Sequence, residues 1–493
     1  MAQEDLENVE PKHELRFNGI NGATGEYLLP SLRPRQIAQI AAGEPLDAEE
    51  VEELKRHWFR ASQPHFAPMP GIDTQDLSQA GWGVIYAPDV SKADKEALSP
   101  LLLLRKGEAK QRYQEFSGDK AYRTGDTKYS FLARSGAGPG PAEKVPYYLL
   151  LVGSPKSIPY RFQYQLDVQY AVGRLHFDRS EQYASYAESV VKAEHRKISL
   201  PPQIKFFGVR NRGDLSTQLS ADQLIKPLKE VLEQQEPDWR CQLFLGADAL
   251  KTNLAKLIGG TETPSLLISA SHGMGFPNGD PRQIPHQGAL LCQDWPGPLK
   301  HTGAIPEDFY FAADDIATEA KLEGLIAFFF ACYSGGTPQI DDFSHLGLVS
   351  QTEIAPFPFV AALPRRMLGH PKGGALAVIG HVERAWSYSF MWSRAGKQLA
   401  VFEAAISELV NGRRVGSAME FFNMRYSELS TDLTEELKDR KFRRARPEFE
   451  TVSEDEALAE MWTANNDARS YVVLGDPAVR LAAPREPSVS KTS

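Results

Sequence analysis

The feature that most constrains the fold is a short apolar run that ends in a cysteine and a glycine turn. Every residue of Leu325–Ala331 (LIAFFFA) is apolar, and Cys332 and the turn-forming Ser334–Gly336 follow it. The run is too short for a helix of normal size, so it predicts a fully buried strand.

A second stretch has the same pattern. Ser265–Ala270 (SLLISA) predicts another buried strand, and Ser271, His272 and Gly273 come directly after it. In an open parallel sheet, functional groups gather just beyond the carboxyl ends of the strands. If the two strands are parallel neighbours, the imidazole of His272 and the thiol of Cys332 meet at one edge of the sheet.

A thiol and an imidazole placed in this way can perform nucleophilic catalysis. The thiolate is the reactive form, so Cys332 needs a nearby base, which His272 can supply. The backbone amides of Gly273 and Cys332 can form an oxyanion hole, and glycine at 273 leaves room for a substrate carbonyl. The alternative is a buried structural thiol and a loop histidine. The two strand-end motifs, in the order His then Cys, favour catalysis.

Composition excludes several classes of protein. A net charge of -9 over 493 residues argues against a main role in binding nucleic acid or an anionic membrane. The three cysteines lack CxxC spacing, which predicts neither a disulfide framework nor a zinc site and indicates a reducing compartment. No signal peptide and no apolar run of ~20 residues is visible, so we expect a cytoplasmic protein without a membrane span. Motifs for nucleotide binding, zincins and serine hydrolases are absent, and we expect no cofactor and no metal.

Strands and helices alternate along most of the chain, which predicts βαβ units and a mostly parallel sheet flanked by helices. Further strands are predicted at Gly83–Ala87, Tyr147–Gly153, Tyr170–Arg174, Ile204–Val209, Cys241–Leu245, Gly374–Gly380 and Tyr471–Leu474. Helices are predicted at Asp47–Phe59, Ser180–Arg196, Ser220–Gln234, Asp248–Ile258 and within Ala395–Leu437. Gly118–Ala142 and Gly275–Asp308 are predicted to be long loops.

The two strand-end motifs resemble a known clan of enzymes. SLLISASHGMGF followed by LIAFFFACYSGGT is similar to the cysteine peptidases that include caspases, metacaspases, gingipains, separase and the bacterial CHAT proteases. LLLVGSPKSIPYRFQYQLDVQYAVGRL and YVVLGDPAVRL resemble the substrate-side subdomain and the terminal strand of the gingipain-like and CHAT-like branches. The likeness covers roughly Trp82–Leu481.

This resemblance implies a caspase-haemoglobinase-like α/β fold with two caspase-like halves in one chain. It implies a cysteine endopeptidase that cleaves protein substrates, with His272 as general base and acid, Cys332 as nucleophile, and the Gly273 and Cys332 amides as oxyanion donors. It also implies a bacterial effector protease that is regulated by an activating partner or by autoprocessing. The expected organisation is an N-terminal extension (1–74), a non-catalytic half (75–198), a catalytic half (199–400), and a helical C-terminal region with a closing strand and a disordered tail (401–493).

Substrate specificity is predicted from fewer residues. Metacaspases carry an acid two places before the nucleophile that helps bind a basic P1 side chain, but this chain has Phe330 there. Asp167 lies where gingipain-like proteins place a P1-binding acid, which favours a basic P1 residue; a turn or cap aspartate is the alternative. Glu383, Trp386 and Tyr388 follow the strand Gly374–Gly380, where the clan walls the P1 pocket, although the aromatic residues could equally belong to the core.

Other interpretations stay open. The basic run Lys438–Arg446 (KDRKFRRAR) is either a solvated surface turn or a self-cleavage or partner-docking segment. A catalytically inactive caspase-like scaffold would share the fold, and another Cys-His acyl-transfer enzyme, such as an amidase, would share the dyad.

Overall fold

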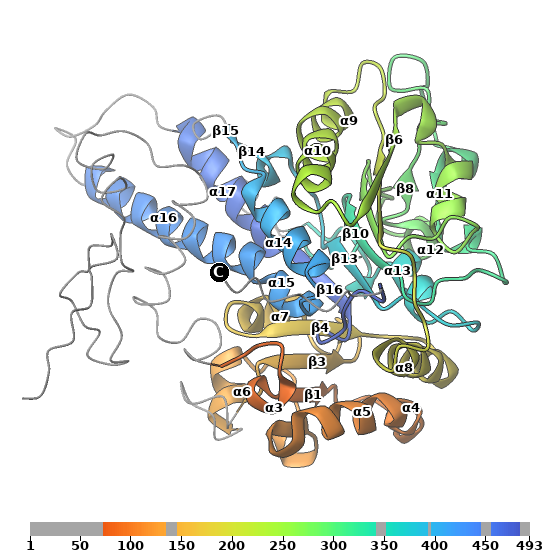
Figure 1. The fold of residues 1–493 in the computed structure, drawn as a ribbon. Helices are drawn as coiled ribbons and strands as arrows, with labels where there is room; N and C mark the ends of the chain where they lie inside the picture. The colour runs from red at the N-terminus through yellow and green to blue at the C-terminus, as the bar shows by residue number, and fades with distance from the viewer. Residues whose placement is uncertain (1–71, 135–144, 342–351, 393–395, 445–454, 484–493) are drawn as a thin grey trace, which may run out of the picture. The chain divides into compact units, whose positions relative to one another are not determined.

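The computed structural model describes residues 72–134, 145–341, 352–392, 396–444 and 455–483, all within the compact unit Gly71–Ser493 (Figure 1). Their centre is a ten-stranded sheet in the order β2-β1-β3-β4-β16-β13-β10-β7-β5-β6. The strands are β1 (Trp82–Tyr86), β2 (Tyr113–Phe116), β3 (Tyr148–Val152), β4 (Ala171–Leu175), β5 (Gln203–Gly208), β6 (Arg240–Leu245), β7 (Leu266–Ala270), β10 (Ile326–Phe330), β13 (Ala377–His381) and β16 (Tyr471–Gly475).

The predicted α/β fold with a mostly parallel sheet is confirmed. Every residue of β1, β3, β4, β7, β10, β13 and β16 is buried, which explains why their sequences are apolar runs with little alternation. Short two-residue strands accompany the sheet: β8 (Leu290–Leu291), β9 (Tyr310–Phe311), β11 (Gly336–Thr337), β12 (Phe359–Val360), β14 (Met391–Trp392) and β15 (Gly396–Lys397).

Helices cover the sheet on both faces; in Figure 1, α10 and α14 lie on one side of β10 and β13, and α11 and α13 on the other. The helices are α3 (Leu77–Ala80), α4 (Lys92–Ala97), α5 (Ser99–Ala109), α6 (Lys128–Arg134), α7 (Tyr160–Asp167), α8 (Ser180–Glu194), α9 (Leu215–Leu219), α10 (Lys226–Gln235), α11 (Lys251–Leu257), α12 (Gln283–His286), α13 (Ala362–Leu368), α14 (Ala400–Val410), α15 (Val415–Ala418), α16 (Glu420–Arg444) and α17 (Asp455–Arg469). In the described part of the chain, none of them is long and apolar enough to cross a membrane.

The sheet consists of two parallel blocks that run in opposite directions. One block joins β1, β2, β3, β4 and β16, and the other joins β5, β6, β7, β10 and β13. The blocks meet where β16 pairs antiparallel with β13, with Tyr471 opposite His381 and Gly475 opposite Ala377. As a result, the amino end of β4 lies at the same edge of the sheet as the carboxyl ends of β7, β10 and β13.

A buried ion-pair cluster anchors the turn that follows β16. The carboxylate of Asp476 accepts hydrogen bonds from Arg105 Nε at 2.7 Å and from Trp82 Nε1 at 2.9 Å, and its backbone amide donates to the Tyr186 hydroxyl. Arg105 and Asp476 are both fully buried. The Gly-Asp-Pro turn therefore ties β16 to β1, α5 and α8.

Several boundaries differ from those predicted. The loop expected at Gly118–Ala142 contains α6, and the loop expected at Gly275–Asp308 contains α12 and β8. Residues 438–444 continue α16, so a surface turn is wrong for that part of the basic run; residues 445 and 446 lie outside the described residues, as does the helix predicted at Asp47–Phe59. The helix expected to begin at Ser220 begins earlier, as α9 at Leu215, with Asp214 in the N-cap position.

Candidate active site

The two strand-end motifs lie side by side. β7 and β10 are parallel neighbours, with Ala270 opposite Phe330 at their carboxyl ends. The pairing extends one step further, because the Ser271 amide donates to the Phe330 carbonyl at 3.2 Å. His272 and Cys332 therefore leave the sheet together at one edge, as the sequence predicts.

Gly273 fills the space between the two motifs. A Cβ at this position would lie 1.7 Å from the carbonyl oxygen of Cys332 and 2.9 Å from its nitrogen. Only glycine allows this contact, because any side chain would overlap the backbone of the neighbouring strand end. Among the described residues, neither the Gly273 amide nor the Cys332 amide donates a hydrogen bond to another residue. Both are therefore available to a ligand oxygen.

A third residue, which the sequence analysis missed, completes the group. His272 Nε2 lies 2.8 Å from Asp214 Oδ2, and that oxygen also accepts a hydrogen bond from Thr217 Oγ1 at 2.8 Å. Burial raises the pKa of the Asp214 carboxyl, but the hydrogen bonds and the charge interaction with His272 outweigh it, so the net pKa is lowered. Asp214 is thus an anionic partner that holds one imidazole nitrogen and leaves Nδ1 for other contacts.

Asp214 reaches His272 because their strands are adjacent. It follows β5, which pairs in parallel with β7, and it occupies the N-cap position of α9. The edge of the Trp295 ring packs against the imidazole, with ring centroids 6.2 Å apart. A polar residue just beyond the carboxyl end of Ile204–Val209 was the signal that could have identified Asp214 from sequence.

The Cys332 thiol faces the segment that follows β13. The Ala385 amide donates to Sγ at 3.3 Å, and Sγ lies 3.7 Å from the Ala385 carbonyl oxygen, to which the thiol donates. Burial raises the pKa of the Cys332 thiol, and the Ala385 amide and the nearby Arg384 cation oppose that rise only in part. The thiol therefore rests in its protonated form.

Helix α17 supports the loop that contains Ala385 through one buried side chain. Asp467, which is fully buried, accepts hydrogen bonds from the Trp386 amide at 2.8 Å and from the Ser389 hydroxyl. His381 is also buried, and its Nε2 lies 3.1 Å from the Asp467 carbonyl oxygen. His381 is therefore part of the support of this loop.

The residues predicted to wall the P1 pocket are placed differently from one another. Glu383 is 2% exposed and has a left-handed backbone (φ 71°). Its carboxylate pairs with Arg384, and its backbone carbonyl accepts a hydrogen bond from the Tyr333 amide at 2.6 Å. It shapes the loop from the inside. The side chain of Trp386 is exposed beside the thiol loop. The backbone of Tyr388 lies in a short 3-10 turn, and its side chain lies outside the described residues.

Asp167 lies at the same edge of the sheet, at the end of α7 and just before β4. Its Oδ2 is buried and has no hydrogen-bond partner among the described residues. Burial raises the pKa of the Asp167 carboxyl well above its usual range, and the nearby Arg174 only partly offsets this. Phe330, at the position where metacaspases carry an acid, packs into the core with its ring 5.4 Å from that of Phe390.

The described residues include no group of three or more potential metal ligands.

Comparison with known proteins gives matches in structure alone. No family model and no curated protein sequence matches the chain. The solved structure of the Arg-specific cysteine proteinase gingipain R is similar with 14% identity and a TM-score of 0.48, over 82% of this chain and 78% of that one. A structure described only as a protease has 13% identity and a TM-score of 0.46. Separase from Saccharomyces cerevisiae, in complex with securin, has 11% identity and a TM-score of 0.33, over 16% of that chain. Likeness at this level assigns no activity, and the CHAT-like part of the resemblance stays a prediction.

Proposed function

We propose that the chain is a cysteine endopeptidase in which Cys332 is the nucleophile and His272 the general base and acid. The observation that carries this proposal is the meeting of three strand ends. Asp214, His272 and Cys332 follow β5, β7 and β10, which are consecutive neighbours in the sheet. Chance placement of a carboxylate, an imidazole and a thiol in this order is a weaker explanation than catalysis, since the triad arrangement recurs on unrelated folds.

The reaction would begin with proton transfer, because the resting thiol is protonated. Nε2–H of His272 is held by Asp214, so Nδ1 accepts the thiol proton as the thiolate attacks the substrate carbonyl carbon. The Gly273 and Cys332 amides would bind the oxyanion. His272 then returns the proton to the departing amine, and water hydrolyses the thioester to release the acid and the free thiol.

A preference for a basic P1 residue is the second part of the proposal. A buried carboxyl oxygen without a hydrogen-bond partner is costly, and Asp167 Oδ2 is such an atom, although the Val172 amide bonds the same carboxyl group. The guanidinium or ammonium of an arginine or lysine substrate would satisfy it and return its proton to solvent. Trp386, which is exposed at the thiol loop, would contribute an apolar wall to the same pocket.

The thiol contact with Ala385 fits a resting enzyme that needs activation. Sγ donates to the Ala385 carbonyl instead of to the imidazole, and a shift of the loop after β13 would free the thiol to donate to His272. A partner protein or autoprocessing could supply that adjustment. A protein substrate is the expected ligand, as the resemblance to the clan of cysteine peptidases implies.

Mass spectrometry of new peptide termini tests the proposal. Wild type and Cys332→Ala are incubated with a denatured proteome, and Cys241→Ala, which removes another free thiol, is the matched control. We expect cuts with wild type and Cys241→Ala only, mostly after arginine or lysine, and expect Asp167→Asn to lose that preference. Cuts by Cys332→Ala would refute the nucleophile. If Cys332 reacts with a thiol probe but no peptide is cut, a different acyl-transfer enzyme is favoured, and absence of both points to a scaffold.

A further inference from the structure

Thr217 takes no part in the proposed reaction, yet its hydroxyl contacts the carboxylate that holds His272. Thr217 is 2% exposed, and its Oγ1 donates to Asp214 Oδ2 at 2.8 Å. That same carboxylate oxygen lies 2.8 Å from His272 Nε2. A buried hydroxyl needs a hydrogen-bond partner, and the partner here is the one carboxylate oxygen that the imidazole uses.

The position of Thr217 in its helix makes this contact unusual. Asp214 is the N-cap of α9 (Leu215–Leu219), so Thr217 is the third helical residue. In a capping box, the side chain at that position reaches back to the backbone amide of the N-cap residue. Thr217 instead reaches the side chain of the N-cap residue, a contact that helix capping alone does not require.

The direction of the Thr217 proton is set by a second neighbour. The Asn211 amide donates to Thr217 Oγ1 at 3.0 Å, so this oxygen is the acceptor there and its own proton is left for another group. The nearer acceptor for that proton is Asp214 Oδ2, since the Asp214 carbonyl oxygen lies at 3.3 Å. Asn211, Thr217, Asp214 and His272 thus form one hydrogen-bonded chain that converges on the carboxylate. In a buried chain of this kind, each bond strengthens the next.

The segment between β5 and α9 has other attachments that do not involve the hydroxyl. Asn211 is 1% exposed, and its Nδ2 donates to the Trp295 carbonyl oxygen at 2.5 Å. Gln218 Nε2 donates to the Asn211 carbonyl oxygen at 2.9 Å. Removal of the Thr217 hydroxyl would therefore keep this segment attached at two points while it releases the Asp214 carboxylate and the Asn211 amide.

We propose that Thr217 is a positioning residue for the reaction. Its hydroxyl fixes the Asp214 carboxylate in the orientation that holds Nε2–H of His272, and so keeps Nδ1 available to the Cys332 thiol. The hydroxyl adds no charge, so the carboxylate keeps its attraction for the imidazolium that forms during the reaction. This role rests on the proposed peptidase function, because it concerns the proton transfer between His272 and Cys332.

Thr217→Val and Thr217→Ser test the proposal, because valine keeps the shape without the hydroxyl and serine keeps the hydroxyl without the methyl group. On a peptide that wild type cuts, we expect kcat of Thr217→Val to fall by about tenfold to 10²-fold with KM little changed, as for loss of a hydrogen bond to a charged group. Thr217→Ser should retain most of the wild-type kcat. Alkylation of Cys332 by iodoacetamide should also slow in Thr217→Val, and that measurement needs no peptidase activity.

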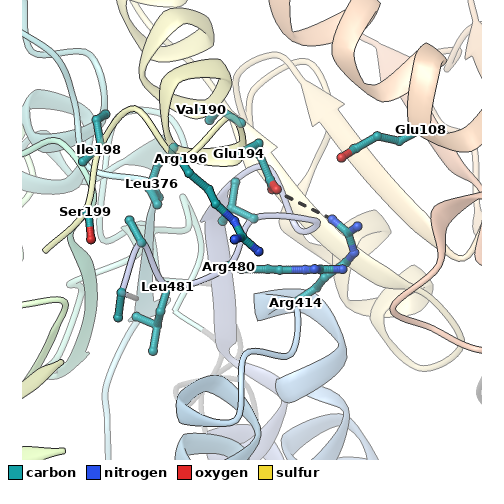
Figure 2. A pocket seen from close by; sticks show the side chains of 14 residues that line it. Glu108, Val190, Glu194, Arg196, Ile198, Ser199, Leu376, Arg414, Arg480 and Leu481 are labelled. Carbon is teal, nitrogen blue, oxygen red and sulfur yellow. Dashed lines mark ion pairs between the residues drawn. The ribbon is translucent and has the colours of Figure 1, made fainter. Parts of the chain in front are cut away.

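Two control variants should keep the wild-type kcat and alkylation rate. Thr337→Val makes the same change at a residue that is 0% exposed and whose Oγ1 has no hydrogen-bond partner among the described residues. Arg196→Ala changes an exposed side chain at the opposite edge of the sheet. There Arg196 lines a cavity of about 460 Å³ together with Leu376, which precedes β13 (Figure 2). All rates are measured below the melting transition of each variant.

The order of the two Thr217 variants decides between positioning and packing. If Thr217 only fills space, serine is the more damaging change and Thr217→Val keeps its kcat, which would overturn the proposal. An equal loss of kcat in both variants, or an effect of Thr217→Val confined to KM, would also overturn it. If wild type cuts no peptide, the peptidase function fails and the alkylation rates decide: slower alkylation in Thr217→Val than in Thr217→Ser supports the positioning role, and equal rates refute it.

Discussion

Replacement of Gly273 by alanine is the sharpest test of how the two strand ends work together. The new Cβ would lie 1.7 Å from the Cys332 carbonyl oxygen, whereas Cβ atoms hardly ever come closer than 3.0 Å to another heavy atom. The three nearest atoms all belong to the Cys332 backbone, so no side chain can turn away. The strand ends must therefore separate by roughly 1.3 Å, the difference between these two distances.

That displacement acts directly on the catalytic geometry. It moves the thiol relative to His272 and moves the Gly273 amide out of the proposed oxyanion hole. A misplacement of about 1 Å costs about 10²-fold in rate, so we expect kcat/KM on a peptide that wild type cuts to fall by ~10²-fold or more. Overpacking of this kind also lowers the free energy of unfolding by about 1–3 kcal/mol, which thermal unfolding would report.

The chain offers a matched control two residues further on. A Cβ at Gly275 would lie 3.5 Å from the nearest atom, Tyr333 Cε2, which is an ordinary contact. Gly275→Ala should therefore keep wild-type activity and stability. The rate at which iodoacetamide alkylates Cys332 reports the same geometry without any substrate. If Gly273→Ala cleaves peptide, reacts with iodoacetamide and unfolds as wild type does, the close approach of the two motifs is refuted.

Three further predictions concern carboxylates. Asp214→Asn removes the charge that holds His272. Steady-state kinetics should show kcat lower by about 10²–10⁴-fold with KM little changed. An unchanged kcat would mean that Asp214 acts only as the N-cap of α9. Because the folded-state pKa of Asp214 is lowered, the stability from its carboxylate is present above the unfolded value of about 3.9 and is lost as pH falls through the folded value. Melting temperatures of wild type and Asp214→Asn should therefore differ most at neutral pH and converge in strong acid, and a gap that widens in acid would contradict this. Asp476→Ala removes a buried ion-pair partner of Arg105 and should lower the free energy of unfolding, measured in urea, by ~3–5 kcal/mol. Asp222→Ala, which breaks an exposed pair with Arg210, should lower it by less than ~1 kcal/mol. Equal losses would show that burial of the pair does not decide its contribution.

The buried strands could be predicted from sequence because their environment leaves a direct mark on composition. A strand covered on both faces is mostly apolar, as Leu325–Ala331 is throughout and Ser265–Ala270 is apart from its two serines. Polar residues just past these runs then identify the candidate functional edge. This reasoning located His272 and Cys332, and it would have located Asp214 if the helix after β5 had been expected to start at Leu215 instead of Ser220.

Contacts that depend on the order of distant segments could not be predicted in the same way. The Ala385 amide bonds the Cys332 sulfur in a loop whose next amide, that of Trp386, is held by Asp467, more than eighty residues later. Local propensity contains no information on which buried carboxylate supports which loop. The same limit applies to Arg105 and Asp476, whose pairing joins α5 to the turn after the last strand.

The direction of β16 decides whether Asp167 can take part in the proposed specificity. Strand periodicity does not reveal direction relative to a neighbour, so the sequence predicts the strand Tyr471–Leu474 without its orientation. Because β16 is parallel to β4 and antiparallel to β13, the amino end of β4 shares an edge with Cys332. In a sheet that was parallel throughout, Asp167 would lie at the opposite edge, about 16 Å away along a five-residue strand. The reversal at the last strand therefore brings Cys332, His272 and Asp167 to a single edge, and the proposed basic P1 pocket requires that edge.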